Sequence, residues 1–119
     1  MTEVEITSIQ LQYPGIPTEY LSYLKNVGWG DFRECGYMIY SGLVTLDSLG
    51  LSEAYLLKED VIFFGDNFSG DMAGFNINNN YSVVELWHES GKLHETKLNF
   101  RKFIGEKMGL GPFGKDLFK

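Results

Sequence analysis

The segment from Gly65 to Gly70 contains the residue types that could carry chemistry, because glycines stand beside Asp66 and, directly after the segment, Asp71. The glycine spacing is that of a phosphate-binding loop. The lysine and the Ser or Thr that should follow the second glycine are replaced by Asp71 and Met72. Acidic side chains repel phosphate, so the pattern does not favour a phosphate site.

A calcium loop counted from Asp66 is not supported either. Such a loop needs oxygen ligands at alternate positions, a glycine in the middle and a glutamate at its end. Phe68, Asp71 and Ile77 stand at three of these positions instead. We therefore predict that the aspartates bond the loop's own amides, and we predict no metal-binding residues.

Thiol chemistry is the remaining candidate. A nucleophilic Cys35 would need a histidine base, and nothing singles out His88 or His94, so the cysteine is predicted to be buried and inert.

A two-residue turn at Ser90-Gly91 would pair Trp87 with His94 and place the two histidines on opposite faces. They could then not share one metal. The sequence predicts no catalytic residues, no cofactor-binding residues and no cofactor.

The elements that position this loop form a predicted hairpin. Val61 to Phe64 is β-branched and aromatic and is predicted to be a buried strand, and Met72 to Ile77 is a second strand weakened by Gly74. Tyr81 to Trp87 is a third strand, with Val83, Glu85 and Trp87 on one face.

The N-terminal third is predicted to contain two strands and one helix. Apolar residues roughly alternate from Val4 to Tyr13, which indicates an edge strand. A helix is predicted from Ile16-Pro17 to about Val27, because proline suits a first turn and Gly28 can close the last one. Trp29 to Phe32 is read as a turn, and Glu34 to Tyr40 as a strand with Tyr37 and Ile39 on one face.

The rest of the chain is predicted to add short helical turns, a helix and a tail. Leu43 to Leu57 reads as one or two helical turns, with Asp47 and Ser52 as candidate N-caps. Asn99 caps a last helix whose apolar stripe contains Phe100, Phe103, Ile104 and Met108, and residues 109–119 form a tail. This order predicts one α+β domain over residues 1–119, a mostly antiparallel sheet with helices packed on one face.

Composition limits the possible environments and partners. The chain has 119 residues, 44% of them hydrophobic, and no apolar run approaches the ~20 residues of a membrane span. A lone cysteine and an N-terminus without a basic, apolar signal predict a cytoplasmic protein that does not bind membranes. The net charge of -6 weakens binding to nucleic acid and favours a basic protein partner.

Several segments together resemble the SUKH superfamily (the Smi/Knr-like proteins). Residues 16–30, Ile-Pro-Thr-Glu-Tyr-Leu-Ser-Tyr-Leu-Lys-Asn-Val-Gly-Trp-Gly, are similar to its helix and glycine turn, and residues 64–71 to its loop ending in Gly-Asp. Residues 83–89 are similar to its later strand, and Asn99-Phe100-x-x-Phe103-Ile104 to its last helix. The resemblance covers about residues 16–108. Family members usually carry an amphipathic helix before this region, whereas Val4 to Tyr13 reads as a strand.

The resemblance implies a non-enzymatic binding protein. Bacterial members are mostly immunity proteins that neutralise toxins, often nucleases, and other members are scaffolds or regulators, which is the alternative here. At positions matching the family motifs, the residues expected to be structural are Pro17, Tyr20, Gly65, Gly70, Asp71 and Phe103. Because interfaces favour tryptophan, we nominate as partner-binding residues two tryptophans and their acidic neighbours: Trp29, Asp31, Glu85, Trp87 and Glu89.

Overall fold

The sheet consists of six strands that follow one another in chain order. The computed structural model describes residues 3–26, 28–32, 36–46, 48–50 and 60–108, without the side chains of residues 31, 32 and 108. The elements are α1 (Glu3–Gln12), α2 (Thr18–Asn26), β1 (Gly30–Phe32), β2 (Tyr37–Val44), β3 (Val61–Asp66), β4 (Met72–Asn76), the 3₁₀ turn η2 (Ile77–Asn79), β5 (Ser82–Trp87), β6 (Lys92–Glu95) and α3 (Phe100–Met108). Each strand pairs antiparallel with the next, in the order β1-β2-β3-β4-β5-β6.

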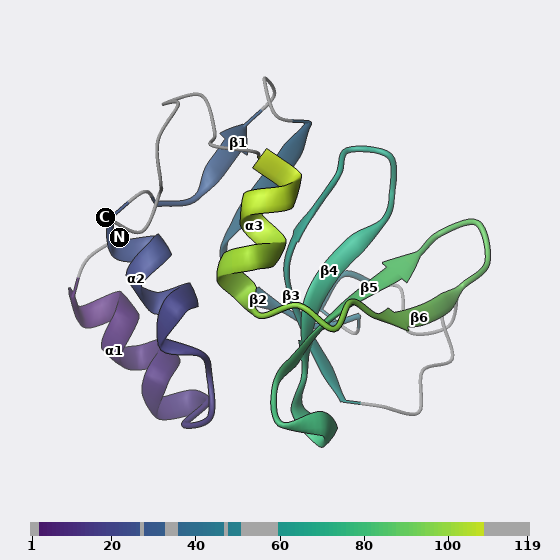
Figure 1. Ribbon diagram of the computed structural model, residues 1–119. Helices are drawn as coiled ribbons and strands as arrows, with labels where there is room; N and C mark the ends of the chain where they lie inside the picture. The colour runs from purple at the N-terminus through teal and green to yellow at the C-terminus, as the bar shows by residue number, and fades with distance from the viewer. Residues whose placement is uncertain (1–2, 27, 33–35, 47, 51–59, 109–119) are drawn as a thin grey trace.

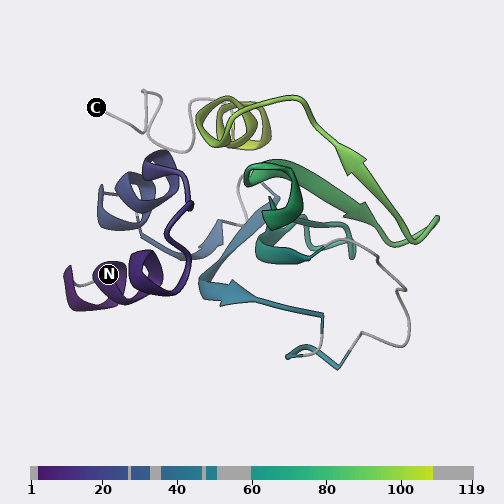
Figure 2. The same cartoon turned by 90° about the horizontal axis from the view of Figure 1, so that it is seen from below.

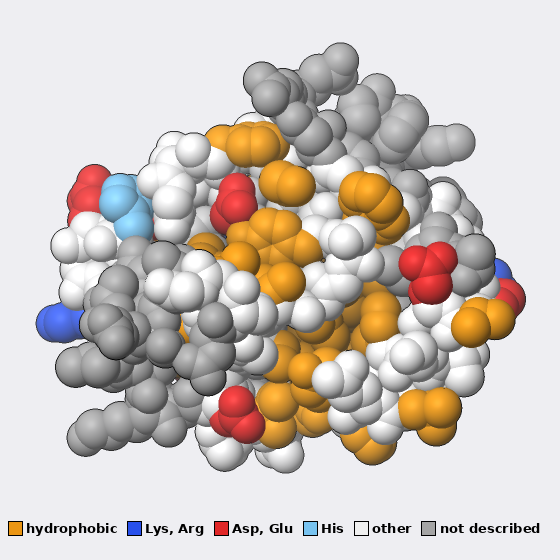
Figure 3. All heavy atoms as spheres, turned by 180° about the vertical axis from the view of Figure 1, so that it is seen from behind, with side chains coloured by type: hydrophobic (Ala, Val, Ile, Leu, Met, Phe, Trp, Pro, Cys, Tyr) orange, Lys and Arg blue, Asp and Glu red, His pale blue; other side chains and the backbone are white. Residues whose placement is uncertain are grey.

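The helices α2 and α3 pack on one face of this sheet, as predicted, and α1 lies against α2 (Figure 1). Their buried side chains join those of alternate strand residues in one core, which includes Tyr20, Phe64, Phe75 and Phe100. The other face carries a smaller cluster around Phe63, with hydrophobic side chains gathered across its middle (Figure 3). The α+β prediction, with a mostly antiparallel sheet and helices on one face, is confirmed.

Aromatic rings form the centre of the helix-facing core. The Tyr20 ring of α2 meets the Phe75 ring of β4 and the Phe100 ring of α3 edge to face, with centroids 5.4 and 5.3 Å apart. Phe64 of β3 meets Phe100 at 5.1 Å and Phe103 at 5.7 Å in the same manner. Such edge-to-face contacts stabilise beyond simple area burial. Two helices and two strands are therefore tied to a single aromatic cluster.

The predicted edge strand at Val4 to Tyr13 is wrong, because this segment is the helix α1. Ile6, Ile9 and Tyr13 pack against the core at helical spacing, while Val4 and Leu11 are 79% and 77% exposed. Two exposed apolar residues on the outer face remove the amphipathic pattern that normally marks a surface helix. With Ile6, Ile9 and Tyr13, these two exposed residues also produce the approximate alternation of a strand.

The strand predicted from Glu34 to Tyr40 corresponds to β2, which begins and ends later in the chain. Residues 34 and 35 of the predicted strand lie outside the described part of the chain. The strand begins at Tyr37 and runs to Val44, with Tyr37 and Ile39 buried as expected. Cys35, Asp47, Ser52 and residues 51–59 lie outside the described part of the chain. In the described part of residues 43–57, Leu43 and Val44 belong to β2 rather than to a helical turn, and a turn follows in which the Leu49 amide donates to the carbonyls of Thr45 and Leu46.

Two further boundaries were wrong. Gly30 to Phe32, read as a turn, forms β1 by pairing with β2. The predicted two-residue turn at Ser90-Gly91 is a four-residue loop, residues 88–91, so Trp87 pairs with Lys92 rather than His94. The serine side chain favours the wider loop, because its Oγ accepts a hydrogen bond from the Lys92 amide at 3.2 Å.

Candidate partner-binding surface

Two loops are joined at one end of the sheet. The loop of residues 67–71 connects β3 to β4, and the loop of residues 88–91 connects β5 to β6. Oδ1 of Asp71 accepts a hydrogen bond from the His88 amide at 2.9 Å and lies 2.7 Å from Nδ1 of the same residue. We call these two loops, together with Trp87 at the end of β5, the loop-end surface.

The same contacts keep Asp71 ionised. The His88 amide, the His88 ring and the Asn67 side chain together hold the pKa of the Asp71 carboxyl below its ordinary value. Gly70 is required beside this pair, because its φ is +102° and an added Cβ would press on the His88 ring. Asp71 therefore joins the two loops by accepting from the His88 amide, whereas the prediction was that it bonds the amides of its own loop.

The loop of residues 67–71 has a fixed internal geometry. Oδ1 of Asn67 accepts from the amides of Ser69 and Asp71, and Oδ1 of Asp66 accepts from the Phe68 amide at 2.9 Å. These bonds hold Phe68 in the left-handed region, at φ 66°, with 46% of the side chain exposed. Such a conformation is costly for a bulky residue. The loop therefore presents an aromatic side chain to solvent at the expense of backbone strain.

Trp87 is a second exposed aromatic residue at this end. It is 44% exposed, and its ring stacks on that of His94 with centroids 3.7 Å apart and planes 26° apart. The β5–β6 hairpin extends past α3 (Figure 2), so this helix does not cover the end of the hairpin where β5 stops at Trp87. The stack also buries Nε2 of His94, which has no hydrogen-bond partner among the described residues. Trp87 is thus both exposed and fixed in orientation.

The two nominated glutamates of this region differ. Glu85 lies one side-chain position from Trp87 on the same face of β5, but its carboxylate pairs with Nζ of Lys107 at 3.1 Å and is only 19% exposed. Glu89 is exposed in the 88–91 loop. Glu89 therefore offers its charge to a partner, whereas most of the charge of Glu85 is compensated within the fold.

The structure does not bring the other two nominated residues to this surface. Trp29 is 52% exposed, but it precedes β1 at the opposite edge of the sheet. Three strands separate β1 from β5, so the two tryptophans lie roughly 19 Å apart across the sheet at the usual strand spacing. Asp31 is in β1, and its side chain lies outside the described residues. Trp29 and Trp87 cannot form one compact anchor.

The remaining residues of the predicted structural set hold the core together. The Pro17 carbonyl accepts the first bonds of α2, from the amides of Tyr20 and Leu21. Tyr20 and Phe103 are 0% and 1% exposed. A Cβ on Gly65 would overlap the Met38 carbonyl oxygen of the neighbouring strand, so only glycine fits there.

Sequence reasoning missed two features of the loop-end surface. Phe68 was considered only as a misplaced calcium ligand, although an aromatic residue amid Asp, Asn and Ser in a tight loop is itself a signal of exposure. The link between Asp71 and His88 joins residues 17 positions apart and depends on the β4–β5 register, which the sequence does not specify directly.

No family model, curated protein or solved structure matches this chain. Within the described ranges, no group of three or more His, Cys, Asp and Glu side chains is arranged to hold a metal ion. No helix in the described part of the chain combines the length and the apolar character needed to cross a bilayer.

Proposed function

We propose that this protein is a non-enzymatic, SUKH-like immunity protein of the cytoplasm, which neutralises a basic toxin domain by binding it. The observation that carries this proposal is the exposed and fixed Trp87 on the loop-end surface. Tryptophan is among the residue types most enriched at the positions that dominate protein interfaces. The helix α1, which precedes α2, agrees with the usual arrangement of the resembled superfamily.

Charge supports the choice of partner. A nuclease domain presents lysine and arginine to phosphates, and a protein of net charge -6 is attracted to the same surface. Exposed Glu89 stands beside the aromatic residues of the loop-end surface. Charge would raise the rate of encounter, and the aromatic anchors would supply most of the affinity.

The two tryptophans provide a matched test, because both are about half exposed and they lie on different strands. We expect Trp87→Ala to weaken binding of the toxin domain encoded beside this gene by about 30-fold, as for a central interface residue. Trp29→Ala should leave the dissociation constant nearly unchanged. Both variants are compared with wild type by surface plasmon resonance and by rescue of cells that express the toxin.

Three outcomes contradict parts of the proposal. A loss confined to Trp29→Ala would move the interface to β1, and wild-type affinity in both variants would remove tryptophan from it. Failure of wild-type protein to rescue cells from the neighbouring toxin would reject the immunity function and favour the scaffold or regulatory alternative.

A further inference from the structure

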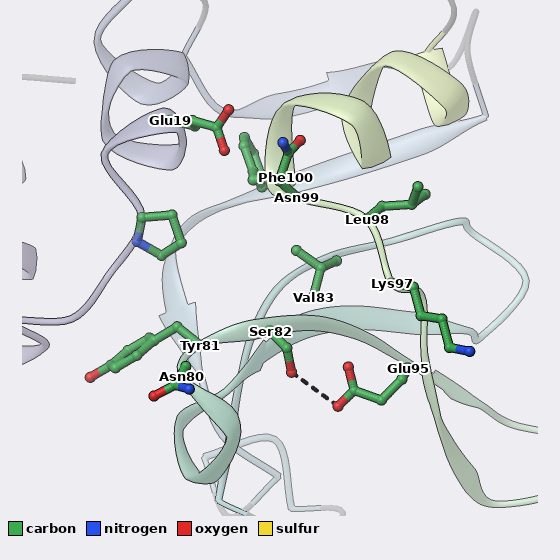
Figure 4. A pocket seen from close by; sticks show the side chains of 11 residues that line it. Glu19, Asn80, Tyr81, Ser82, Val83, Glu95, Lys97, Leu98, Asn99 and Phe100 are labelled. Atoms are coloured by element: carbon green, nitrogen blue, oxygen red, sulfur yellow. Dashed lines mark hydrogen bonds between the residues drawn. The ribbon is translucent and has the colours of Figure 1, made fainter.

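A pocket of about 380 Å³ lies at the other end of β5 from Trp87. It opens between residues 80–83, residues 97–100 and the first turn of α2 (Figure 4). Its volume is at the small end of the range for ligand sites, which suits a small molecule or one long side chain of a partner. Nothing in the proposed interface described so far uses this pocket.

The rim of the pocket has an unusual and well-held backbone. The described chain has four non-glycine residues with left-handed φ, and three of them line the pocket: Asn80 at 53°, Tyr81 at 58° and Lys97 at 61°. The Tyr81 amide donates to the Asn76 carbonyl at 2.9 Å. An added Cβ on Gly15 would overlap the Tyr81 ring, so the ring packs closely on the chain before α2. The rim is therefore formed before any ligand arrives.

Two carboxylates supply the polar part of the lining. Oε2 of Glu95 accepts from Ser82 at 3.0 Å and from Asn79 at 3.1 Å, while no described residue bonds its Oε1. Glu19 extends from α2 toward the start of α3 (Figure 4) and forms no ion pair within the described residues. The apolar part comes chiefly from Pro17 and Val83, while the Tyr81 ring extends away from both carboxylates (Figure 4).

This combination matches a guanidinium group. Arginine presents a planar fork of donors that fits carboxylates, and its aliphatic stem packs along apolar groups such as Pro17 and Val83. An anion fits less well, although the pocket borders two helix N-termini. Asn99 already caps α3 by accepting from the Lys102 amide at 2.8 Å, and the Glu19 carboxylate lies toward the same helix end. Lys97, the one cation in the lining, points away from Glu19 in Figure 4.

We propose that this pocket binds an arginine side chain presented by the partner. The inference rests on the proposed function, since it assigns a subsite to a basic partner. The pocket and Trp87 lie at the two ends of a strand of 6 residues, roughly 17 Å apart. A standard interface of about 800 Å² on each partner is roughly 30 Å across, so one partner can cover both.

The first test needs no partner. N-acetyl-arginine methylamide is titrated into the ¹⁵N-labelled protein, with the lysine analogue and inorganic phosphate as separate probes. We expect saturable shifts of the Tyr81, Val83 and Lys97 amides with the arginine probe only. Glu19→Gln should weaken this binding about tenfold, as for a lost charge-assisted bond, and Glu89→Gln at the far end of β5 should not.

The second test uses the toxin domain. Glu19→Gln should raise its dissociation constant about tenfold, with Glu3→Gln on α1 as the comparison for loss of one charge outside both surfaces. Stronger shifts with phosphate, or no saturable shift with the arginine probe, would overturn the pocket assignment whatever the partner does. Equal binding of the toxin domain to wild type and to Glu19→Gln would also overturn the pocket assignment. The proposed immunity function would not be affected by that result, because it is tested separately by rescue and by Trp87→Ala.

Discussion

The carboxylate of Asp71 links two loops through a single residue, and this link should depend on pH. The pKa of the Asp71 carboxyl is lowered in the folded protein, chiefly by the hydrogen bond from the His88 amide. The ionised carboxylate therefore stabilises the fold at pH values above the unfolded pKa of about 3.9. This stabilisation is lost as the pH falls through the lower pKa of the folded state. Asp71→Asn should cost about 1 kcal/mol at pH 7 and much less at pH 2, measured by urea unfolding at both pH values. An equal difference at both would show that the carboxylate's charge contributes nothing.

Individual residues also show where sequence reasoning was reliable. The bonds of Asp66 and Asn67 to amides of their own loop followed from local chemistry, because a glycine-rich polar loop has few other ways to satisfy its amides. The need for glycine at position 65 did not, since it arises from the Met38 carbonyl of the neighbouring strand. The separation of Trp29 from Trp87 could not be predicted, since it depends on the number of strands between them. Exposure of Trp87 depends in turn on where α3 ends over the sheet.

At the level of elements, α3 is held mainly by its aromatic side chains. Phe103 is 1% exposed and meets the rings of Phe64 and Tyr37. Phe103→Ala should therefore cost roughly 3–5 kcal/mol, measured by chemical denaturation. Lys102→Ala, on the exposed side of the same helix, should change stability by less than about 0.5 kcal/mol. Similar midpoints for the two variants would mean that α3 contributes little to the core.

The elements that were predicted correctly have local sequence patterns, whereas the elements that were missed depend on residues whose exposure or hydrogen bonds alter the expected pattern. The β3–β4 hairpin and the cap at Asn99 were predicted because buried strands and N-caps have local signatures. The helix α1 was missed because its exposed Val4 and Leu11 hide the amphipathic period. The β5–β6 register was missed by two residues because one serine bond widens the turn.

For the whole molecule, the net charge should affect the speed of binding more than its strength. Glu89→Lys and Glu3→Lys each change the net charge from -6 to -4, since each replaces one negative charge with one positive charge. Glu3 lies on α1, away from the loop-end surface. We expect Glu89→Lys to slow association with the toxin domain by more than Glu3→Lys at low salt, and the difference should shrink at high salt. Stopped-flow association rates at rising salt concentration measure this. Association independent of salt would discard the electrostatic part of the mechanism.

The sheet order β1-β2-β3-β4-β5-β6 also has a consequence for how the chain is made. Every strand pairs with its predecessor, so each new strand can dock as soon as it leaves the ribosome, without waiting for a distant segment. Short-range pairing of this kind favours rapid folding. The aromatic cluster, however, is completed only by Phe100 and Phe103 of α3, close to the end of the described chain. A nascent chain halted before α3 would have its strands in order but its core open, and the last helix would convert this sheet into a cooperative unit.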